Sequence, residues 1–132
     1  MRKTVFDTSV LIRHWIHCGG RSPKNKTLAD AESWGRSLVE AHDSNAVLTP
    51  VYIEFVAGAR STAELRLAEA YLEQFEIIDN RSILKQDWEE AERLARRVPR
   101  SGKPRQLVDC LVRAIANRLN RDVFTLDQTF PA

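Results

Sequence analysis

The sequence has few of the residues on which several common kinds of protein depend. Only two of its 132 residues are cysteine, Cys18 and Cys110, which is too few for a disulfide framework, so we expect reduced thiols. Glycine is also scarce, and Gly19-Gly20 is followed by no Lys-Ser/Thr pair, which excludes a glycine-rich phosphate loop. No apolar stretch approaches the roughly 18 to 20 residues of a membrane span, and no signal-peptide core follows the initial MRK. We therefore expect a cytoplasmic chain that starts at Met1 and makes no membrane contact.

The residues that are present favour one globular domain covering residues 1–132. The chain is 43% hydrophobic and 29% charged, with a formal net charge of +2. This composition and length allow a sizeable buried core. Short apolar runs separated by helical segments predict an α/β fold, with a central, mainly parallel sheet of about four short strands flanked by helices. The expected strands are Thr4–Phe6, Ala46–Thr49, Phe75–Ile78 and Val123–Leu126.

Capping residues and apolar periodicity predict where the helices lie. Thr49 before Pro50 is typical of an N-cap and a first-turn proline, and Ser61 with Glu64 predicts a capping box. Trp88 is predicted to face inward. The expected helices begin at Asp7 and then cover about 27–41, 49–60, 61 onward, a span after Ser82 to about 97, and 107–119.

Four carboxylates interrupt or directly follow apolar runs: Asp7, Glu54, Asp109 and Asp127. An ionised carboxylate bound for the interior costs several kcal/mol unless a cation, a hydrogen-bond network or a metal compensates it. Asp7 and Asp127 are expected just beyond strand ends, Glu54 on the helix after the second strand, and Asp109 in about the second turn of its helix. Ligands of parallel sheets bind beyond the carboxyl ends of the strands. We therefore expect all four acids to face one crevice and to hold a divalent cation.

Each acid also has a purely structural interpretation. Asp7 and Asp109 are N-cap types, Asp127 is able to start a turn, and Glu54 is able to pair with Arg60 or Arg113. We favour the shared site because all four acids would otherwise need separate structural roles.

Other residues have weaker functional interpretations. The cluster of His14, His17 and Cys18 matches no common closed zinc site, so these residues are expected on a helix surface. The three tryptophans are expected in core or interface positions rather than stacked on bases.

A basic stretch runs into Asp109. Between Arg93 and Val108 every charged residue is a cation, which suits an enzyme that acts on a polyanion. A solvated surface loop is the alternative. The residues expected to bind the polyanion are Arg96, Arg97, Arg100, Lys103 and Arg105.

Three segments, in this order, resemble the PIN-domain proteins, specifically VapC-type toxins of type II toxin–antitoxin pairs: FDTSVLI, PVYIEFVAGAR and VDCLVRAIANRLNRDVFTLDQTF. The resemblance implies a Mg²⁺- or Mn²⁺-dependent ribonuclease whose acidic residues are the same four carboxylates. It also implies an accessory hydroxyl from Thr8 or Ser9 and another from Thr125. A cognate antitoxin is the implied protein partner.

The residues and the resemblance together predict an endoribonuclease that uses a metal-activated water. Asp7, Asp109 and Asp127 would hold the metal and Glu54 would complete the site. Arg113, four residues after Asp109, is placed to pair with an acid or to contact RNA.

Two other functional classes remain as alternatives. One is a metal-dependent phosphatase or phosphotransferase with Asp7 as nucleophile, although Ser9 stands where such enzymes usually place a second acid. The other is a non-catalytic cation- and RNA-binding module. A receiver-like domain is one form of this class, but it requires a lysine after a late strand, and Thr125 to Gln128 contains none.

Apolar residues on the early helices predict a protein interface. Trp15, Ile16, Tyr52 and Phe55 are expected to form an exposed surface for an antitoxin helix or a second copy, and we predict at least a homodimer.

Overall fold

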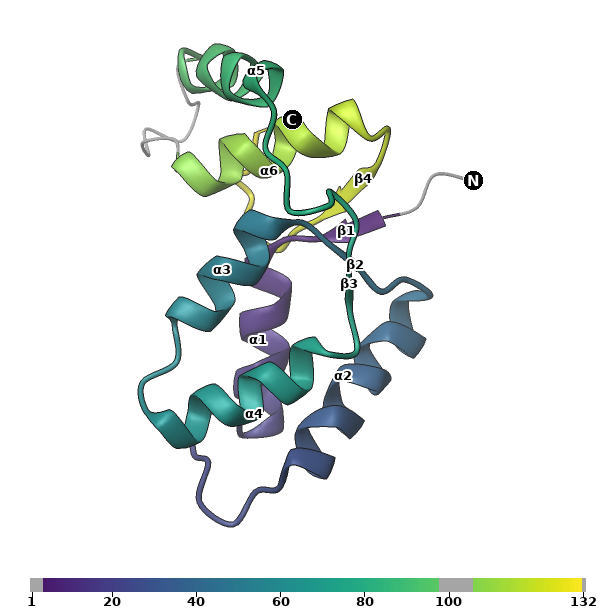
Figure 1. The fold of residues 1–132 in the computed structure, drawn as a ribbon, viewed down its shortest axis with the longest axis vertical. Coiled ribbons are helices and arrows are strands. Elements are labelled where there is room, and N and C mark those ends of the chain that lie inside the picture. Colours follow the sequence, from purple (N-terminus) through teal and green to yellow (C-terminus); the bar gives the residue numbers. More distant parts are fainter. Residues whose placement is uncertain (1–3, 98–105, 132) are drawn as a thin grey trace.

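A computed structural model describes residues 4–97 and 106–131, which form a four-stranded parallel sheet flanked by helices (Figure 1). The α/β fold with a mainly parallel sheet is therefore confirmed. The strands are β1 (Thr4–Phe6), β2 (Ala46–Val47), β3 (Glu76–Ile77) and β4 (Asp122–Phe124). The helices in these ranges are α1 (Thr8–Cys18), α2 (Leu28–His42), α3 (Thr49–Ala57), α4 (Thr62–Leu72), α5 (Lys85–Ala95) and α6 (Leu107–Arg118).

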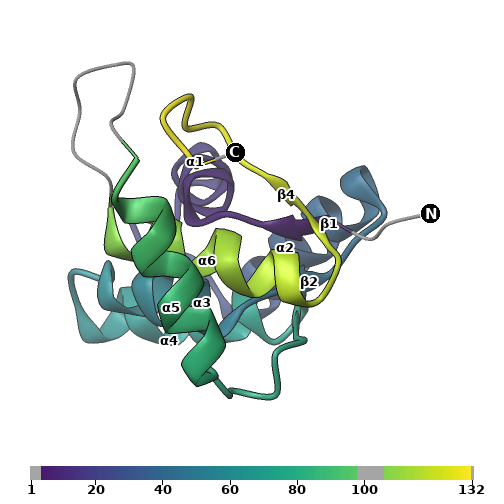
Figure 2. The same cartoon turned by 90° about the horizontal axis from the view of Figure 1, so that it is seen from above.

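The strand order β3-β2-β1-β4 puts the first strand inside the sheet. Val5 pairs with Ala46 of β2 and with Val123 of β4. In the view of Figure 1, α5 and α6 lie above the sheet and the four earlier helices lie below it, and Figure 2 shows the same layers from above. Helices on both sides of the sheet explain why consecutive residues of β1, Val5 and Phe6, are both buried. The pairing of β1 with β4 places Asp7, the next residue, beside the segment that follows β4.

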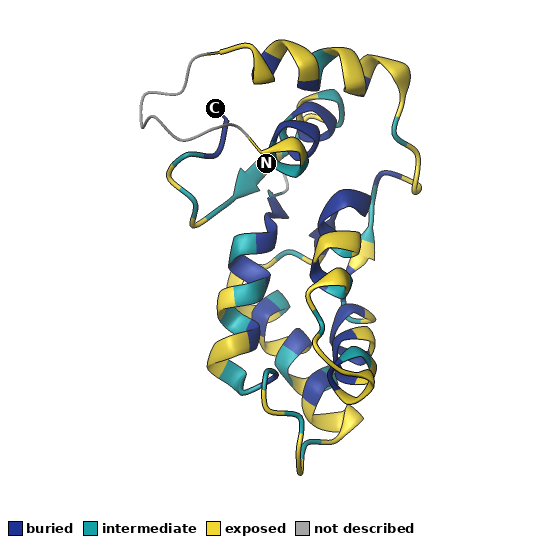
Figure 3. Cartoon of the chain, turned by 90° about the vertical axis from the view of Figure 1, so that its left-hand side faces the viewer, coloured by how far each residue is buried: buried dark blue, intermediate teal, exposed yellow. Residues whose placement is uncertain are grey.

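Aromatic rings join the helices below the sheet. Tyr71 of α4 is fully buried, with its ring stacked on Phe55 at 5.4 Å and edge-on to Trp15 at 5.0 Å between centroids. Figure 3 shows buried residues on the sides of these helices that face one another. Such contacts add to the free energy of burial and fix α1, α3 and α4 relative to one another.

The predicted interface on the early helices is wrong in half of its residues. Trp15 is 2% exposed and Phe55 is 5% exposed, because both rings belong to this aromatic core. Ile16 is 54% exposed and remains at the surface. Trp88, predicted to face inward, is 49% exposed, because α5 turns Asp87, Ala91 and Leu94 toward the protein instead.

Two predicted helix starts need correction. Thr49 is not the N-cap of α3, which is Leu48, because the Thr49 hydroxyl donates to Asp79 instead. Ser61 caps α4 as predicted, accepting from the Glu64 backbone N–H at 3.0 Å. The prediction of a full capping box is wrong, since the Glu64 side chain accepts from the Arg60 backbone N–H and not from that of Ser61.

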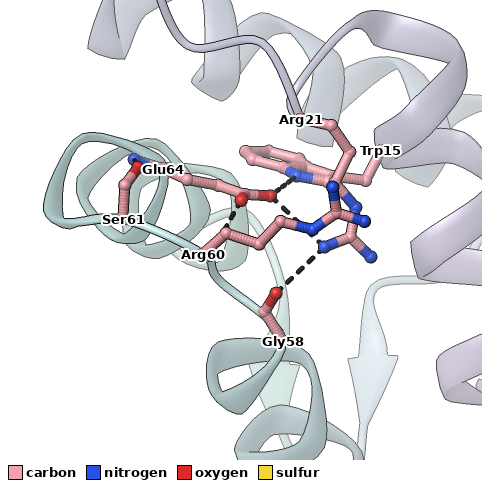
Figure 4. A network of polar contacts seen from close by, with 6 residues as sticks. All are labelled: Trp15, Arg21, Gly58, Arg60, Ser61 and Glu64. Atoms are coloured by element: carbon pink, nitrogen blue, oxygen red, sulfur yellow. Dashed lines mark hydrogen bonds and ion pairs between the residues drawn. The ribbon is translucent and has the colours of Figure 1, made fainter.

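The Glu64 carboxylate is buried and joins three separate segments (Figure 4). It accepts a hydrogen bond from Trp15 Nε1 at 2.8 Å and another from the Arg60 backbone N–H at 2.9 Å. The Arg21 guanidinium lies 3.7 Å away and also donates to the Gly58 carbonyl. These bonds compensate the desolvation of the carboxylate and tie the end of α1 to α3 and α4.

None of the helices in the described residues has the length and hydrophobicity that a membrane crossing requires.

Candidate metal-binding site

Asp7 follows β1 directly and lies at the carboxyl end of the sheet. Its backbone N–H donates to the Phe124 carbonyl at 2.8 Å, which extends the pairing of β1 with β4. The residue occupies the N-cap position of α1, but its side chain makes no capping hydrogen bond. Helix capping therefore does not account for this buried carboxylate.

The two oxygens of Asp7 have different surroundings. Oδ2 accepts from Ser9 Oγ at 2.9 Å and from Thr125 Oγ1 at 2.7 Å. Oδ1 is buried and has no hydrogen-bond partner among the residues that the structure describes. A buried acceptor without a partner is costly, and a bound cation would remove that cost.

The hydroxyls of Ser9 and Thr125 connect the start of α1 to the segment after β4. Their oxygens lie 3.3 Å apart. The Leu126 backbone N–H donates to Ser9 Oγ, and the Asp127 backbone N–H donates to Thr125 Oγ1, both at 3.0 Å. The hydroxyl of Thr8 is buried, and within residues 4–97 and 106–131 it has no hydrogen-bond partner. Of the two candidates beside the first acid, the residue that contacts Asp7 is thus Ser9.

Asp127 lies in the turn after β4, three residues beyond the strand end. Its Oδ1 accepts from the Thr129 backbone N–H at 2.9 Å and from the Thr129 hydroxyl at 2.7 Å. This local arrangement is an Asx turn, which fixes the side chain. Thr129 was missed by the sequence analysis, although an Asp followed two residues later by Thr is the signal for such a turn.

The helix α6 begins at Leu107 as predicted, after the N-cap Gln106, so Asp109 is its third residue and lies in the first turn, not in about the second as expected. Its pKa is raised to about 7, first by burial and then by the charges of Asp7, Asp127 and Glu54. All three other acids are therefore close enough to repel its charge. The fold brings the four predicted residues into one electrostatic neighbourhood.

Glu54 differs from the other acids because it is exposed. Its position within an apolar run suggested burial, but α3 turns Val51 and Phe55 inward and leaves Ile53 59% exposed beside it. In the part of the chain that the structure describes, it forms no ion pair with Arg60 or with any other cation. The structural alternative for Glu54 is thus not found.

Arg113 has a contact that the sequence analysis did not consider. Its Nε donates to the Pro131 carbonyl at 2.8 Å, and its guanidinium lies 5.4 Å from the centre of the Phe130 ring. These contacts hold the segment after Asp127 against α6. Arg113 therefore positions this segment.

Asp79 is a further acid at the same edge of the sheet, and sequence analysis missed it. It follows β3 and the apolar Ile77-Ile78, so the rule that selected the other acids also applied to it. The side chain is buried and accepts from Thr49 N at 2.9 Å, Thr49 Oγ1 at 2.6 Å and Arg81 N at 3.2 Å. Because its donors are already present, Asp79 anchors the start of α3 and thereby positions Glu54.

The structure describes only some of the residues predicted to bind a polyanion. Arg96 and Arg97 are exposed after α5, and Arg96 pairs with Glu92. Arg100, Lys103 and Arg105 lie outside the described residues.

The four acids fit a divalent cation in their chemistry. Their donor atoms are all carboxylate oxygens, which hard cations such as Mg²⁺ prefer. Within residues 4–97 and 106–131, no three His, Cys, Asp or Glu side chains stand close enough together to hold a metal ion in their present positions. The partnerless Asp7 oxygen and the raised pKa of Asp109 are the two features that a cation would relieve.

Comparison with known families gives one match. The family model described as the PIN domain matches residues 4–132, which is nearly the whole chain. No curated protein matches the chain.

Proposed function

Since the chain belongs to the PIN-domain family, whose members are generally metal-dependent nucleases, we propose that it is a Mg²⁺- or Mn²⁺-dependent endoribonuclease. The observation that carries this proposal is the electrostatic convergence of Asp7, Glu54 and Asp127 on Asp109. A nuclease site needs such a concentration of carboxylates to hold a cation against the substrate phosphate.

The proposed roles follow from the contacts of each acid. Asp7, Asp109 and Asp127 would hold the metal and Glu54 would complete the site from the exposed face of α3. The bound metal would supply water activation and stabilise the charge that develops on the phosphoryl group. Ser9 and Thr125 hold one Asp7 oxygen and thereby orient the other. Thr129 holds Asp127, and its contact removes one rotational freedom that metal binding would otherwise have to restrict.

The first test is cleavage of a single-stranded RNA with internal label. We expect cleavage at internal phosphodiesters in Mg²⁺ or Mn²⁺ and none in EDTA. Single-stranded DNA of the same sequence and a phosphomonoester are incubated in parallel. Release of phosphate from the monoester without RNA cleavage would favour a phosphatase, and binding of RNA without cleavage of any substrate would favour a non-catalytic module.

We further propose that the basic stretch binds the RNA backbone. Each phosphate contact with a single strand releases counterion and contributes about 0.7 to the slope of log K against log salt. Changing Arg100, Lys103 and Arg105 to Ala is therefore expected to flatten this slope by up to about two units without changing metal affinity. Binding is measured by fluorescence anisotropy on an inactive background.

The control for this stretch is a triple variant with the same loss of charge. Lys24, Arg36 and Arg66 are exposed on the loop before α2, on α2 and on α4, away from α6 in Figure 1. Their replacement by Ala should leave the salt slope near that of the wild type. Equal slopes for all three proteins would show that the basic stretch is a solvated loop.

A toxin role with a cognate antitoxin and a homodimer are also proposed, on the resemblance to VapC-type toxins. Ile53, exposed beside Glu54, offers an apolar contact next to the acids, and Ile16 offers a second one on α1. We expect a dimer mass by light scattering, growth arrest on expression, and rescue by the product of a short adjacent gene. A monomer at high concentration together with normal growth would contradict both parts of the proposal.

A further inference from the structure

A groove between α1, α2 and β4 contains every histidine of the chain. It has a volume of about 290 Å³. The sequence has three histidines, and His14, His17 and His42 all line the groove. The remaining lining residues in the described part of the chain are Val10, Arg13, Leu38, Phe124 and Leu126, and none of these carries a carboxylate.

The groove adjoins the acids through the backbone after β4. Leu126, which lies in its wall, stands between Thr125 and Asp127. The Leu126 N–H donates to Ser9 Oγ, and that hydroxyl donates to Asp7. A polymer bound at the acids would therefore place its next unit in the groove.

The groove combines polar side chains with a fixed aromatic surface. Arg13 and His17 are exposed, and within the described residues the His17 ring makes no hydrogen bond. The His42 ring is held edge-on against Phe124 at 4.6 Å and Phe6 at 5.6 Å. Rings fixed in this way lose little entropy when a base packs on them, and the guanidinium is able to pair with a phosphate.

His14 is already engaged and acts as support. Its Nδ1 lies 2.7 Å from the Tyr71 hydroxyl, which belongs to the aromatic core. Burial lowers the pKa of His14, and the neighbouring His17 and His42 lower it further. The electrostatic effect of both rings on His14 shows that the three imidazoles form one cluster.

We propose that this groove binds the nucleotide of the RNA adjacent to the cleaved phosphodiester, with its base against Phe124 and His42 and its phosphate at Arg13 and His17. This inference rests on the proposed ribonuclease function and assigns the subsite that sets its nucleotide preference. The cation and the absence of lining acids match an anion, and the apolar floor matches a base. The volume is at the lower limit of small-ligand pockets, which suits one nucleotide better than a partner helix about 10 Å wide.

The test uses the full chain with Asp109→Asn, without metal, and a labelled single-stranded RNA. We expect the pair of changes Arg13→Gln and His17→Gln to weaken RNA binding about tenfold. Arg36→Gln, an exposed change on α2 with the same loss of formal charge, should leave binding unchanged. In imidazole NMR spectra, the signals of His17 and His42 should shift as RNA is added.

A second measurement separates this inference from the proposed function. In the background with all four acids intact, the Arg13→Gln and His17→Gln variant should alter the preference among RNAs that differ at one nucleotide beside the cut. Wild-type cleavage with unaltered preference, unaltered RNA affinity and unshifted histidine signals would overturn the groove assignment and leave the ribonuclease function standing. Absence of RNA cleavage by the wild type would overturn the proposed function. Histidine signals that shift with an acidic peptide and not with RNA would assign the groove to a protein partner and overturn the inference.

Discussion

Replacing Asp109 with Asn should abolish metal-dependent cleavage and at the same time stabilise the metal-free protein above pH 7. Loss of a metal-holding carboxylate removes several kcal/mol of charge stabilisation, so we expect cleavage to fall at least about 100-fold. Stability should rise because the neutral amide removes the repulsion from Asp7, Asp127 and Glu54. Cleavage of labelled RNA and urea unfolding in EDTA measure the two effects.

The stabilisation should depend on pH in one direction. Burial and the neighbouring acids raise the pKa of Asp109 from 3.8 to about 7 in the folded chain. The folded state therefore binds the extra proton between these values, and wild-type stability falls as the pH rises from about 4 through 7. Because the residue is only partly buried and solvent screens the repulsion, we expect the variant to gain about 1 to 3 kcal/mol at pH 8 and almost nothing at pH 4.

The control is Glu40→Gln, which removes an exposed carboxylate on α2. Its stability should differ little from that of the wild type at either pH. An Asp109→Asn protein that still cleaves RNA in Mg²⁺ would remove this residue from the site. A gain in stability of the same size at pH 4 and pH 8 would mean that the effect is not electrostatic.

Replacing Arg118 with Met should cause a large loss in the free energy of unfolding. Arg118 of α6 donates from Nε at 2.7 Å and from Nη2 at 2.9 Å to the carboxylate of Asp87 on α5. The Asp87 side chain is only 1% exposed, and without Arg118 its buried charge would keep the hydrogen bond from the Leu84 backbone N–H but lose its cation. Breaking a buried pair in this way costs about 3 to 5 kcal/mol, which urea unfolding at pH 7 would measure.

Arg93 provides the matched control for Arg118. It pairs with Glu90 one turn away on α5, where the Arg93 side chain is 55% exposed and the Glu90 side chain is half-buried. Arg93→Met should therefore leave the midpoint of urea unfolding close to that of the wild type. Similar losses for the two variants would show that the Asp87 carboxylate is reached by water after the cation is removed.

The fold was predictable because its signals are local. Each strand overlaps a short apolar run, and Asp7 follows the first run directly, so its place at the sheet edge could be inferred from the sequence. The exposure of Glu54 could not, because the apolar residues on both sides of it are typical of a buried block. Helical periodicity sends Ile53 and Glu54 outward while Phe55 turns in.

The partners of side chains were harder to predict than their positions. Asp79 and Glu64 obey the same local rules as other acids or caps, but each is satisfied by donors from other segments. Arg113 likewise finds the carbonyl of Pro131. Such pairings depend on tertiary packing, which the spacing of residues along the sequence does not indicate. The alternatives for these residues therefore could not be decided without the structure.

The hydrogen bond from Thr125 to Asp7 spans 118 positions of the sequence. The ribosome therefore synthesises Asp7 118 residues before Thr125, and Asp127 and Thr129 follow Thr125. During synthesis, the Asp7 carboxylate lacks that hydroxyl and the Asp127 carboxylate until the segment after β4 has been made. Contacts with this separation form late because the chain must first close a long loop. For a proposed ribonuclease made in contact with messenger RNA, the order of folding delays completion of the cutting site until the segment after β4 has been synthesised.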